Sequence, residues 1–385
     1  MRAFKHLPHP TPRAATCYRT SHRSSACSAS PRVTGSHLPG WLPKYISGAV
    51  EAARSAPSPD NLQPVAFRCS ANSITFVPRP TSVPTFAAQH PVTLMAVGAA
   101  VENVIQAAAA MGVAINAHLR GNSDEYVRIE FAQSASGNWD ALASHPLFKR
   151  HTNRHPYKAT PIPSTLAAAI ADMRVNAARV ALIAGTAGLT RLARATQTAS
   201  EARFRTPEIH AWLGSSLRLT PESAASGDGL DVRTLDLPPG GRHALAYIAD
   251  WHRLERLNRI GAYRMLGAIE SRPIRSGPLS VAIIGEDPIS AGRLMERTWI
   301  YLNAHGLAVQ PYFVIPQQMQ LLDAGSVAAP LRGPIEEMAA DIKSMLRLAS
   351  NEALHLVLRV GWPTRVPMRS ARLPLERLLS FDAGE

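Results

Sequence analysis

Cysteine is scarce in this chain of 385 residues: there are three, and two of them, Cys17 and Cys27, lie within residues 1–40. So few cysteines cannot build a disulfide framework, and we expect a protein of a reducing compartment, the cytoplasm. Long apolar runs are lacking as well. None reaches the ~18 residues that a membrane-spanning helix needs, so we expect no membrane partner.

Acidic residues are absent from residues 1–40, which contain six basic ones. These six account for almost half of the net charge of +13, and the remaining excess is scattered without a lysine- or arginine-rich run. Nucleic-acid-binding proteins concentrate such charge in a patch or along a helix. The scattered charge instead favours a basic fold that holds an anionic cofactor, with no nucleic-acid partner.

Residues 1–40 have little apolar material to bury, since they are rich in Ser, Thr, Pro, Arg and His. We expect a disordered basic tail. Its arginine and serine bias resembles a transit peptide, and a mis-assigned start codon would look the same. The segment lacks the apolar centre of a secretory signal, and both readings stay open.

Several catalytic signatures are missing. The chain has no Gly-x-Ser-x-Gly elbow, no phosphate-binding P-loop and no Gly-x-Gly-x-x-Gly fingerprint. His151 and His155 have a spacing of four residues, but a loop with Arg154 between them and Pro156 after them is a poor metal site. We therefore expect neither a metal ion nor a protein nucleophile or catalytic acid.

Helical and strand patterns alternate along the chain. Helical spacing of apolar residues predicts helices over 43–55, 93–112, 164–173, 187–217, 242–266 and 288–305. Strands are predicted over 65–68, 74–77, 126–131, 179–183, 279–284 and 355–360. Residues 220–241, rich in Gly, Pro, Asp and Ser, have the composition of a long loop or lid. This alternation predicts an α+β or α/β fold with mixed sheets, and we expect the α+β class.

Two of the predicted helices share a pattern of Gly, Glu and Gly at the same spacing, offset by 194 residues. The positions are Gly98, Glu102 and Gly112 in one helix and Gly292, Glu296 and Gly306 in the other. An internal repeat would dictate the whole architecture. The alternative is two unrelated helices that each end in a glycine cap.

The segment 56–64, Ala-Pro-Ser-Pro-Asp-Asn-Leu-Gln-Pro, resembles a loop of FMN-dependent nitroreductases that carries Ser, Asn and Gln at these spacings. Val65 stands where that family usually has tryptophan. The resemblance implies that Ser58, Asn61 and Gln63 contact the polar edge of the flavin, whose donors and acceptors such side chains can match. A turn rich in Asn and Pro, without a ligand, is the alternative.

Residues 150–157 resemble the opening motif of the same family, in which arginines and a hydroxyl hold the FMN phosphate. The resemblance implies this role for Arg150, Thr152 and Arg154, while His151 and Tyr157 depart from the usual Arg and Phe. A solvated basic loop is the alternative.

The end of the chain carries a third resemblance. Residues 358–363 look like the last core strand of the family, and residues 369–375 look like its C-terminal basic motif. That motif also reaches the phosphate, which implies Arg372 and Arg369 as ligands. A basic C-terminal segment that contacts nothing is the alternative.

The order of these motifs implies a fusion. The arginine motif normally opens a nitroreductase, yet here it begins at residue 150. The chain therefore resembles the tandem-fused, Acg-type branch of the family over roughly 41–380, with a first half at 41–145 and a second at 146–385. The resemblance implies a nitroreductase-like fold in which the halves form an intramolecular pseudo-dimer with central helices. We expect one composite flavin site, because each motif occurs in one half alone. We expect a monomer, because the interface between family subunits would already lie within the chain.

The resemblance implies an FMN-dependent oxidoreductase that takes electrons from NAD(P)H and passes them to a small-molecule acceptor such as a nitroaromatic or quinone. In such enzymes the flavin performs the redox chemistry, and the protein binds and shields it. Residues 308–313 match the stretch that lies against the ring, and Trp212 with the lid would cover the pocket. Two alternatives remain: a flavin-sequestering protein with little turnover, and a basic interaction protein on the same scaffold.

Overall fold

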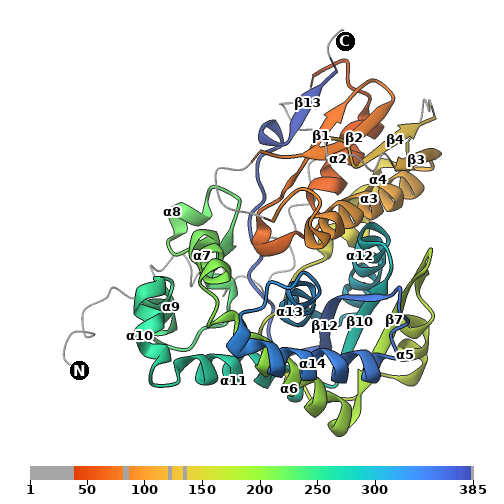
Figure 1. The fold of residues 1–385 in the computed structure, drawn as a ribbon. Helices are drawn as coiled ribbons and strands as arrows, with labels where there is room; N and C mark the ends of the chain where they lie inside the picture. The colour runs from red at the N-terminus through yellow and green to blue at the C-terminus, as the bar shows by residue number, and fades with distance from the viewer. Residues whose placement is uncertain (1–38, 81–85, 120–123, 133–136, 383–385) are drawn as a thin grey trace.

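The computed structural model describes residues 39–80, 86–119, 124–132 and 137–382, and it shows two large β-sheets separated by two central helices. Most of the expected N-terminal tail lies outside these ranges. In Figure 1 the first sheet is at the top and the second is below, with α3 (Pro91–Met111) and α12 (Pro288–Ala304) side by side between them. The α+β class is confirmed, but only the first sheet is mixed, because every strand pair of the second sheet is antiparallel.

The first sheet has the strand order β13-β1-β2-β4-β3. Its strands are β1 (Val65–Cys69), β2 (Ser73–Pro78), β3 (Ile115–Leu119), β4 (Val127–Phe131) and, from the end of the chain, β13 (Leu379–Phe381). The preceding helix α2 (Lys44–Arg54) and α3 pack against it, and the residues of β1 alternate between buried and partly buried. One face of the sheet therefore lies on the core formed with the central helices.

The second sheet has the order β11-β12-β10-β7-β6, and β5 (Tyr157–Lys158) pairs with the end of β12. Its strands are β6 (Arg174–Val175), β7 (Ala178–Ala184), β10 (Leu279–Gly285), β11 (Ala308–Tyr312) and β12 (Ala353–Pro363). β10 is buried along its whole length, as expected for a central strand with helices on both faces. The short helix α5 (Ser164–Ala171) precedes β7.

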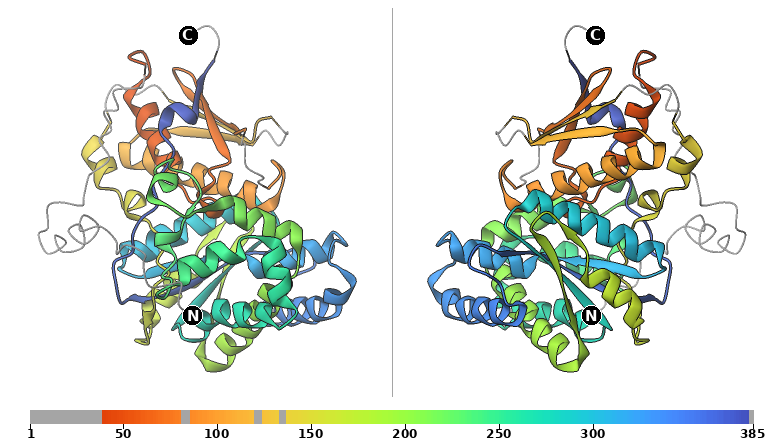
Figure 2. Two further views of the ribbon diagram at one scale, coloured as in Figure 1. Left: turned by 90° about the vertical axis from the view of Figure 1, so that its left-hand side faces the viewer. Right: turned by 90° about the vertical axis from the view of Figure 1, so that its right-hand side faces the viewer.

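The two sheets repeat one pattern. The order β1-β2-β4-β3 of the first sheet recurs as β7-β10-β12-β11 in the second, and every neighbouring pair in both runs is antiparallel. Each sheet has a central helix, α3 or α12, directly before β3 or β11 in the chain. Figure 2 shows these helices between the sheets from two further sides.

The two central helices meet at a pair of glycines. A Cβ atom on Gly98 would lie 2.1 Å from the carbonyl oxygen of Ile289, and one on Gly292 would lie 2.1 Å from the carbonyl oxygen of Met95. Both glycines are therefore needed for the close approach of the helix backbones. The contacts are reciprocal: the two glycines are separated by the same number of residues as the two residues that supply the carbonyl oxygens, Met95 and Ile289.

Helix α3 contradicts the expectation that no segment is long and apolar enough to span a membrane. Within the described residues it is the one helix that is long and apolar enough, with a mean hydropathy of 1.5 over an 18-residue window. That window is 72% buried inside the protein. Its apolar character is explained by its central place between the sheets.

A helical insertion connects β7 to β10 and forms the left and lower part of Figure 1. It comprises α6 (Gly185–Arg203), α7 (Pro207–Ser216), α8 (Pro221–Ala224), α9 (Gly241–Ile248), α10 (Trp251–Asn258) and α11 (Ala262–Arg275), together with β8 (Leu217–Arg218), β9 (Leu230–Asp231) and the 3₁₀ turn η4 (Val232–Thr234). The single helix expected over 242–266 is wrong. Asp250 caps α10 by accepting a hydrogen bond from the Arg253 backbone, and Gly261, at φ 90°, breaks the chain again before α11.

A second core lies on the far side of the second sheet, where α13 (Val314–Asp323) and α14 (Ala329–Leu346) pack with α6. After β12 the chain crosses back to the first sheet. Arg54 at the end of α2 donates a hydrogen bond to the Leu373 carbonyl oxygen, and the turn η5 (Leu375–Arg377) leads into β13, which pairs parallel with β1. The C-terminal residues thus belong to the first sheet although they follow the second.

Candidate functional site

The loop after α2 has an unusual backbone. Asp60, Asn61 and Gln63 adopt left-handed φ angles of 41°, 59° and 50°. Non-glycine residues in this region are strained and persist only where surrounding contacts fix them. One such contact is local: Ser58 Oγ accepts a hydrogen bond of 2.9 Å from the Gln63 backbone. The turn η2 (Pro59–Asn61) lies inside this loop.

The side chains of Asn61 and Gln63 hold three segments together. Asn61 Nδ2 donates to the carbonyl oxygens of Ala371 at 2.9 Å and Gly227 at 3.2 Å. Gln63 Nε2 also donates to Gly227, at 2.9 Å, and Gln63 Oε1 accepts from the Leu373 backbone at 3.0 Å. The motif residues therefore bind the C-terminal segment and the insertion in this conformation.

Four arginines gather beside this loop, and we call them the arginine cluster: Arg54, Arg150, Arg369 and Arg372. Arg150 and Arg372 both donate to the carbonyl oxygen of Ser55, at 3.0 and 3.3 Å. Arg369 donates to the carbonyl oxygen of Arg150 at 2.9 Å, and Arg54 donates to that of Leu373 at 3.0 Å. Backbone carbonyls thus orient guanidinium groups from three distant parts of the chain.

The cluster carries more positive than negative charge. Burial, together with the neighbouring guanidinium groups of Arg150, Arg369 and Arg54, lowers the pKa of Arg372 to about 9, although Glu296 opposes the fall. Burial and Arg150 also lower the pKa of Arg369. Cations that repel one another in a partly buried site create a strong preference for an anion, and guanidinium groups bind phosphate through paired, charge-assisted hydrogen bonds.

A buried carboxyl lies beneath the cluster. Glu296 of α12 is 0% exposed, and its Oε1 lies 3.0 Å from Nε of Arg150, which is 5% exposed. The Arg150 guanidinium also lies over the Trp299 ring, 4.8 Å from its centroid. Burial raises the pKa of Glu296 to about 7, although Arg150 and Arg372 oppose the rise. The carboxyl therefore only partly neutralises the cluster near neutral pH.

Arg154 lies away from the cluster. Its Nη1 is 3.4 Å from Thr234 Oγ1, and its charge acts on the buried carboxyl of Asp60. Asp60 Oδ2 accepts a hydrogen bond of 2.8 Å from Ser216 Oγ, and burial raises the pKa of Asp60. Arg154 thus links the second arginine motif to the strained loop and to the insertion.

Thr152 is partly buried in an extended segment whose backbone is fixed on both sides. The His151 backbone donates to Asn303 Oδ1 at 2.8 Å, and the Asn153 backbone donates to the carbonyl oxygen of Val309 at 2.8 Å. Tyr157 Oη donates to the Asn153 carbonyl at 2.6 Å. The motif at 150–157 therefore lies against α12 and β11, which include the stretch expected to face a flavin ring.

The lid expected over 220–241 is partly ordered into α8, β9 and η4. Its residues 226–230 reach the site: Gly227 lies so close that a Cβ atom would be 2.4 Å from the Arg372 carbonyl oxygen. Asp228 forms an ion pair of 3.1 Å with Arg218, which anchors this segment to β8. Trp212 of α7 packs on Phe86, with ring centroids 5.0 Å apart.

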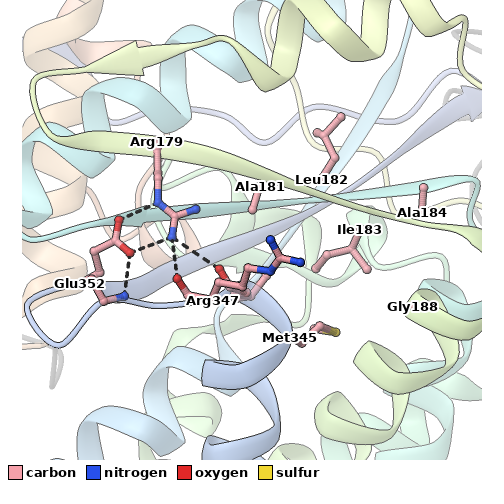
Figure 3. Close-up of a pocket in the computed structure, with 11 residues that line it drawn as sticks. Arg179, Ala181, Leu182, Ile183, Ala184, Gly188, Met345, Arg347 and Glu352 are labelled. Atoms are coloured by element: carbon pink, nitrogen blue, oxygen red, sulfur yellow. Dashed lines mark hydrogen bonds and ion pairs between the residues drawn. The ribbon is translucent and has the colours of Figure 1, made fainter.

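The free space at the strained loop is small. A cavity lined by Arg54, Ser58, Gln63, Phe67 and Ala96, among others, has about 20 Å³, which is room for a water molecule and not for an aromatic ring system. A groove of about 680 Å³ lies elsewhere, beside β7 and the end of α14 (Figure 3). Within the described ranges, no three His, Cys, Asp or Glu side chains gather as metal ligands would.

Sequence reasoning missed two members of the site, Arg54 and Glu296. Arg54 ends α2 and has no motif around it, so only the fold reveals that it meets residues 369–373. Glu296 belongs to the Gly–Glu–Gly repeat. A glutamate at an apolar position of a predicted helix is the signal in the sequence that could have indicated a buried carboxyl at the site. Its counterpart Glu102 is equally buried and pairs with Arg293 at 3.2 Å and Arg297 at 2.8 Å.

No family model matches the chain. An uncharacterized protein of Mycobacterium tuberculosis (strain CDC 1551 / Oshkosh) is 28% identical over 274 residues, which cover 68% of this chain. The chain spans only 38% of the length of that relative.

Several solved nitroreductases resemble the structure weakly. An FMN-dependent nitroreductase from Mycobacterium smegmatis, solved in complex with NADPH, has a TM-score of 0.37 and 17% identity, covering 64% of this chain and 100% of its own. A nitroreductase with bound FMN from Bacteroides fragilis has a TM-score of 0.35 and 12% identity, covering 59% and 91%.

Proposed function

We propose that this chain is an FMN-binding, NAD(P)H-dependent oxidoreductase of the nitroreductase type, in which two tandem halves form a pseudo-dimer around one flavin. The electron acceptor would be a small molecule such as a nitroaromatic or quinone. The arginine cluster is the observation that carries the proposal. It joins the loop of the first repeat to the arginine motifs of the second, as a composite cofactor site requires.

The phosphate end of FMN fits the cluster. Arg150, Arg369 and Arg372 are the residues that would hold the phosphate. Arg54 lies beside them but is paired with Glu51 of the same helix. The pKa of Arg372 is lowered first by burial and then by the neighbouring cations, and a phosphate dianion would offset both effects. Glu296 beneath them sets the orientation of Arg150.

The ring end fits only after a local rearrangement. Asn61 and Gln63 have donors and acceptors suited to a flavin edge, but these atoms contact Gly227, Ala371 and Leu373 in this structure. The small cavity beside them cannot hold a ring system. Withdrawal of residues 226–230 would release the amide nitrogens of Asn61 and Gln63 from Gly227, so we propose that this segment acts as a lid. The contacts of these side chains with residues 371–373 would also have to open.

Bound FMN would supply the two-electron chemistry, and the residues around it would bind, orient and shield it. The guanidinium groups would fix the phosphate, and β11 would offer its backbone to the ring. Lid closure would exclude water from the site. None of these tasks needs a protein nucleophile or a catalytic acid.

The repeated strand order supports the pseudo-dimer, and the two central glutamates support a single site. Glu296 of α12 faces Arg150 of the opening motif. Its counterpart Glu102 of α3 is instead neutralised by Arg293 and Arg297 of the other central helix, α12. At the position of Glu102, arginines of the central helix thus stand in place of the arginines that would bind a phosphate. Because the family interface would be internal, we propose that the chain works as a monomer.

A flavin-sequestering protein with little turnover is the second candidate, and one observation favours it. The lid is fixed by the Arg218–Asp228 ion pair and by the hydrogen bonds from Asn61 and Gln63 to Gly227. A lid held by this many contacts would open slowly and restrict access of NAD(P)H.

An anaerobic titration separates these candidates. The purified protein, loaded with FMN and freed of excess, is mixed with NADH or NADPH while flavin absorbance is followed. Bleaching followed by reoxidation with a quinone supports the oxidoreductase. Flavin that stays oxidised supports sequestration, and failure to bind FMN at all refutes both.

A further inference from the structure

One edge of the second sheet is open among the described residues. β7 pairs with β10 along its length, but on its outer side the hairpin partner β6 pairs only with Ala178 and Arg179. From Val180 onwards no described strand lies on that side. An unpaired edge of this kind presents backbone donors and acceptors that a further strand can bind.

The first sheet shows what covers the equivalent edge. The run β1-β2-β4-β3 corresponds to β7-β10-β12-β11, and the residue pairs along each run can be matched strand by strand. This matching shows that Val180–Leu182 of β7 are equivalent to residues 67–69 of β1. In β1 that edge is paired with β13: the Phe67 backbone donates to the Leu378 carbonyl at 2.8 Å, and the Cys69 carbonyl accepts from Asp382 at 3.2 Å. The corresponding donor and acceptor of β7 are the Val180 N–H and the Leu182 carbonyl.

Among the described residues, no segment pairs with the outer edge of β7 at Val180–Leu182. β13 is the C-terminal strand and is already used on the first sheet. The first repeat has no comparable extension, since β4 is followed by the connection to the second repeat. The repeat pattern is therefore complete on one sheet and lacks its outer strand on the other.

A groove runs beside this edge. It has about 680 Å³, within the range of ligand sites, and its lining includes Ala181, Leu182, Ile183 and Met345. Figure 3 shows the Arg347 side chain extending along the groove toward Ile183, while Arg179 is engaged by Glu352. The groove thus combines an apolar floor, an open strand edge and one exposed cation.

We propose that the β7 edge is a binding site for an extended peptide of a partner protein, which adds as a parallel strand next to Val180–Leu182. The peptide would mimic β13 of this chain, whose Leu379 and Phe381 alternate with a polar residue and precede an acid. Asp382 pairs with Arg68 in the first sheet at 3.1 Å. A carboxylate of the bound peptide would face Arg347. The apolar side chains of the peptide would lie on the face of Val180 and Leu182, and its polar residue and carboxylate would lie on the groove side. Backbone hydrogen bonds would supply affinity, and Arg347 would supply selectivity.

Amide hydrogen exchange of the free, full-length protein gives the first test. The Val180 and Leu182 amides should exchange quickly, while the Ala181 amide, directed toward β10, should exchange slowly. Slow exchange at all three residues in the free protein would mean that the edge is already covered, and the proposal would fail.

The second test uses a synthetic peptide with the sequence of residues 375–382, and a control peptide in which the serine corresponding to Ser380 is replaced by proline. The first peptide should slow exchange at Val180 and Leu182, and the control should not, because proline removes a backbone donor. No protection by the first peptide at millimolar concentration would overturn the proposal, as would equal protection by both.

Protein variants locate the contact. Ala181→Phe fills the groove and should abolish peptide binding, whereas Arg347→Glu should weaken it about fivefold, the upper range for an exposed ion pair. Arg332→Glu, an exposed charge reversal on the same helix, should leave binding unchanged. Thermal unfolding of each variant checks that it folds. Binding that survives both Ala181→Phe and Arg347→Glu contradicts the assignment to this groove.

Discussion

Gly98 and Gly292 lie at reciprocal positions of the two central helices: each would place a Cβ atom 2.1 Å from a carbonyl oxygen of the other helix. The carbonyls belong to Ile289 and Met95, which are themselves related by the offset that relates the glycines. This contact joins the two repeats at their centre. It sets the distance between the sheets and thereby the position of Glu296 beneath the arginine cluster.

Replacing either glycine by alanine should destabilise the protein. A Cβ atom at 2.1 Å from a backbone oxygen forces the helices apart, and overpacking of this kind costs about 3 kcal/mol. Gly333→Ala is the matched control, because nothing lies within 4 Å of its added Cβ and alanine favours a helix by about 0.5–1 kcal/mol. Chemical denaturation measures both. Equal stability of Gly98→Ala and the wild type would contradict the close packing.

Arg372→Met should weaken FMN binding about 10- to 100-fold, the loss expected for a hydrogen bond to a charged group. Riboflavin, which lacks the phosphate, should be affected much less, so the variant should lose the preference for FMN over riboflavin. Arg377→Met, an exposed arginine near the end of the chain, is the control. Fluorescence quenching of each flavin gives the affinities. An unchanged preference in Arg372→Met would exclude this residue from a phosphate site.

The raised pKa of Glu296 predicts how the free energy of unfolding changes with pH. Its pKa rises from 4.5 to about 7 on folding, so the folded state binds the proton more tightly than the unfolded state. The carboxyl is protonated in both states below about pH 4.5, and stability is then lost as pH rises toward 7, by on the order of 3 kcal/mol. Glu296→Gln should flatten this decline between those values. Parallel pH profiles of the free energy of unfolding for variant and wild type would contradict the assignment.

Arg218→Met should loosen the lid. The ion pair with Asp228 is partly buried, with side chains 13% and 19% exposed, and its loss leaves residues 226–230 attached mainly through Asn61 and Gln63. Faster amide exchange in 226–230 and faster association of FMN are expected, with Arg256→Met as an exposed control. If association is as slow as in the wild type, the segment does not gate the site.

The sequence predicts best those elements whose apolar spacing is regular. The helix expected over 93–112 is α3, and the strand expected over 279–284 is β10, which is buried throughout. Other elements have no local signal. β3 is mostly exposed, α14 contains Pro334, and β13 has three residues that become a strand only by pairing with β1.

The candidate site shows the same limit. Motif resemblance indicates Arg150 and Arg372, and the structure brings them together on the carbonyl of Ser55. It also separates Arg154 from that cluster, because Asp60 is buried beside it, and it adds Arg54, which no spacing along the chain could indicate. Contacts between residues hundreds of positions apart depend on the fold and not on local pattern.

The number of FMN molecules bound per chain tests the central claim most directly. Protein of known concentration is saturated with FMN and freed of excess, and the flavin released on denaturation is measured by its absorbance. One FMN per chain is expected, since the arginine cluster occurs at Glu296 and is replaced by an internal ion-pair network at Glu102. Two FMN per chain would show that both sites work, and no bound FMN would contradict the account.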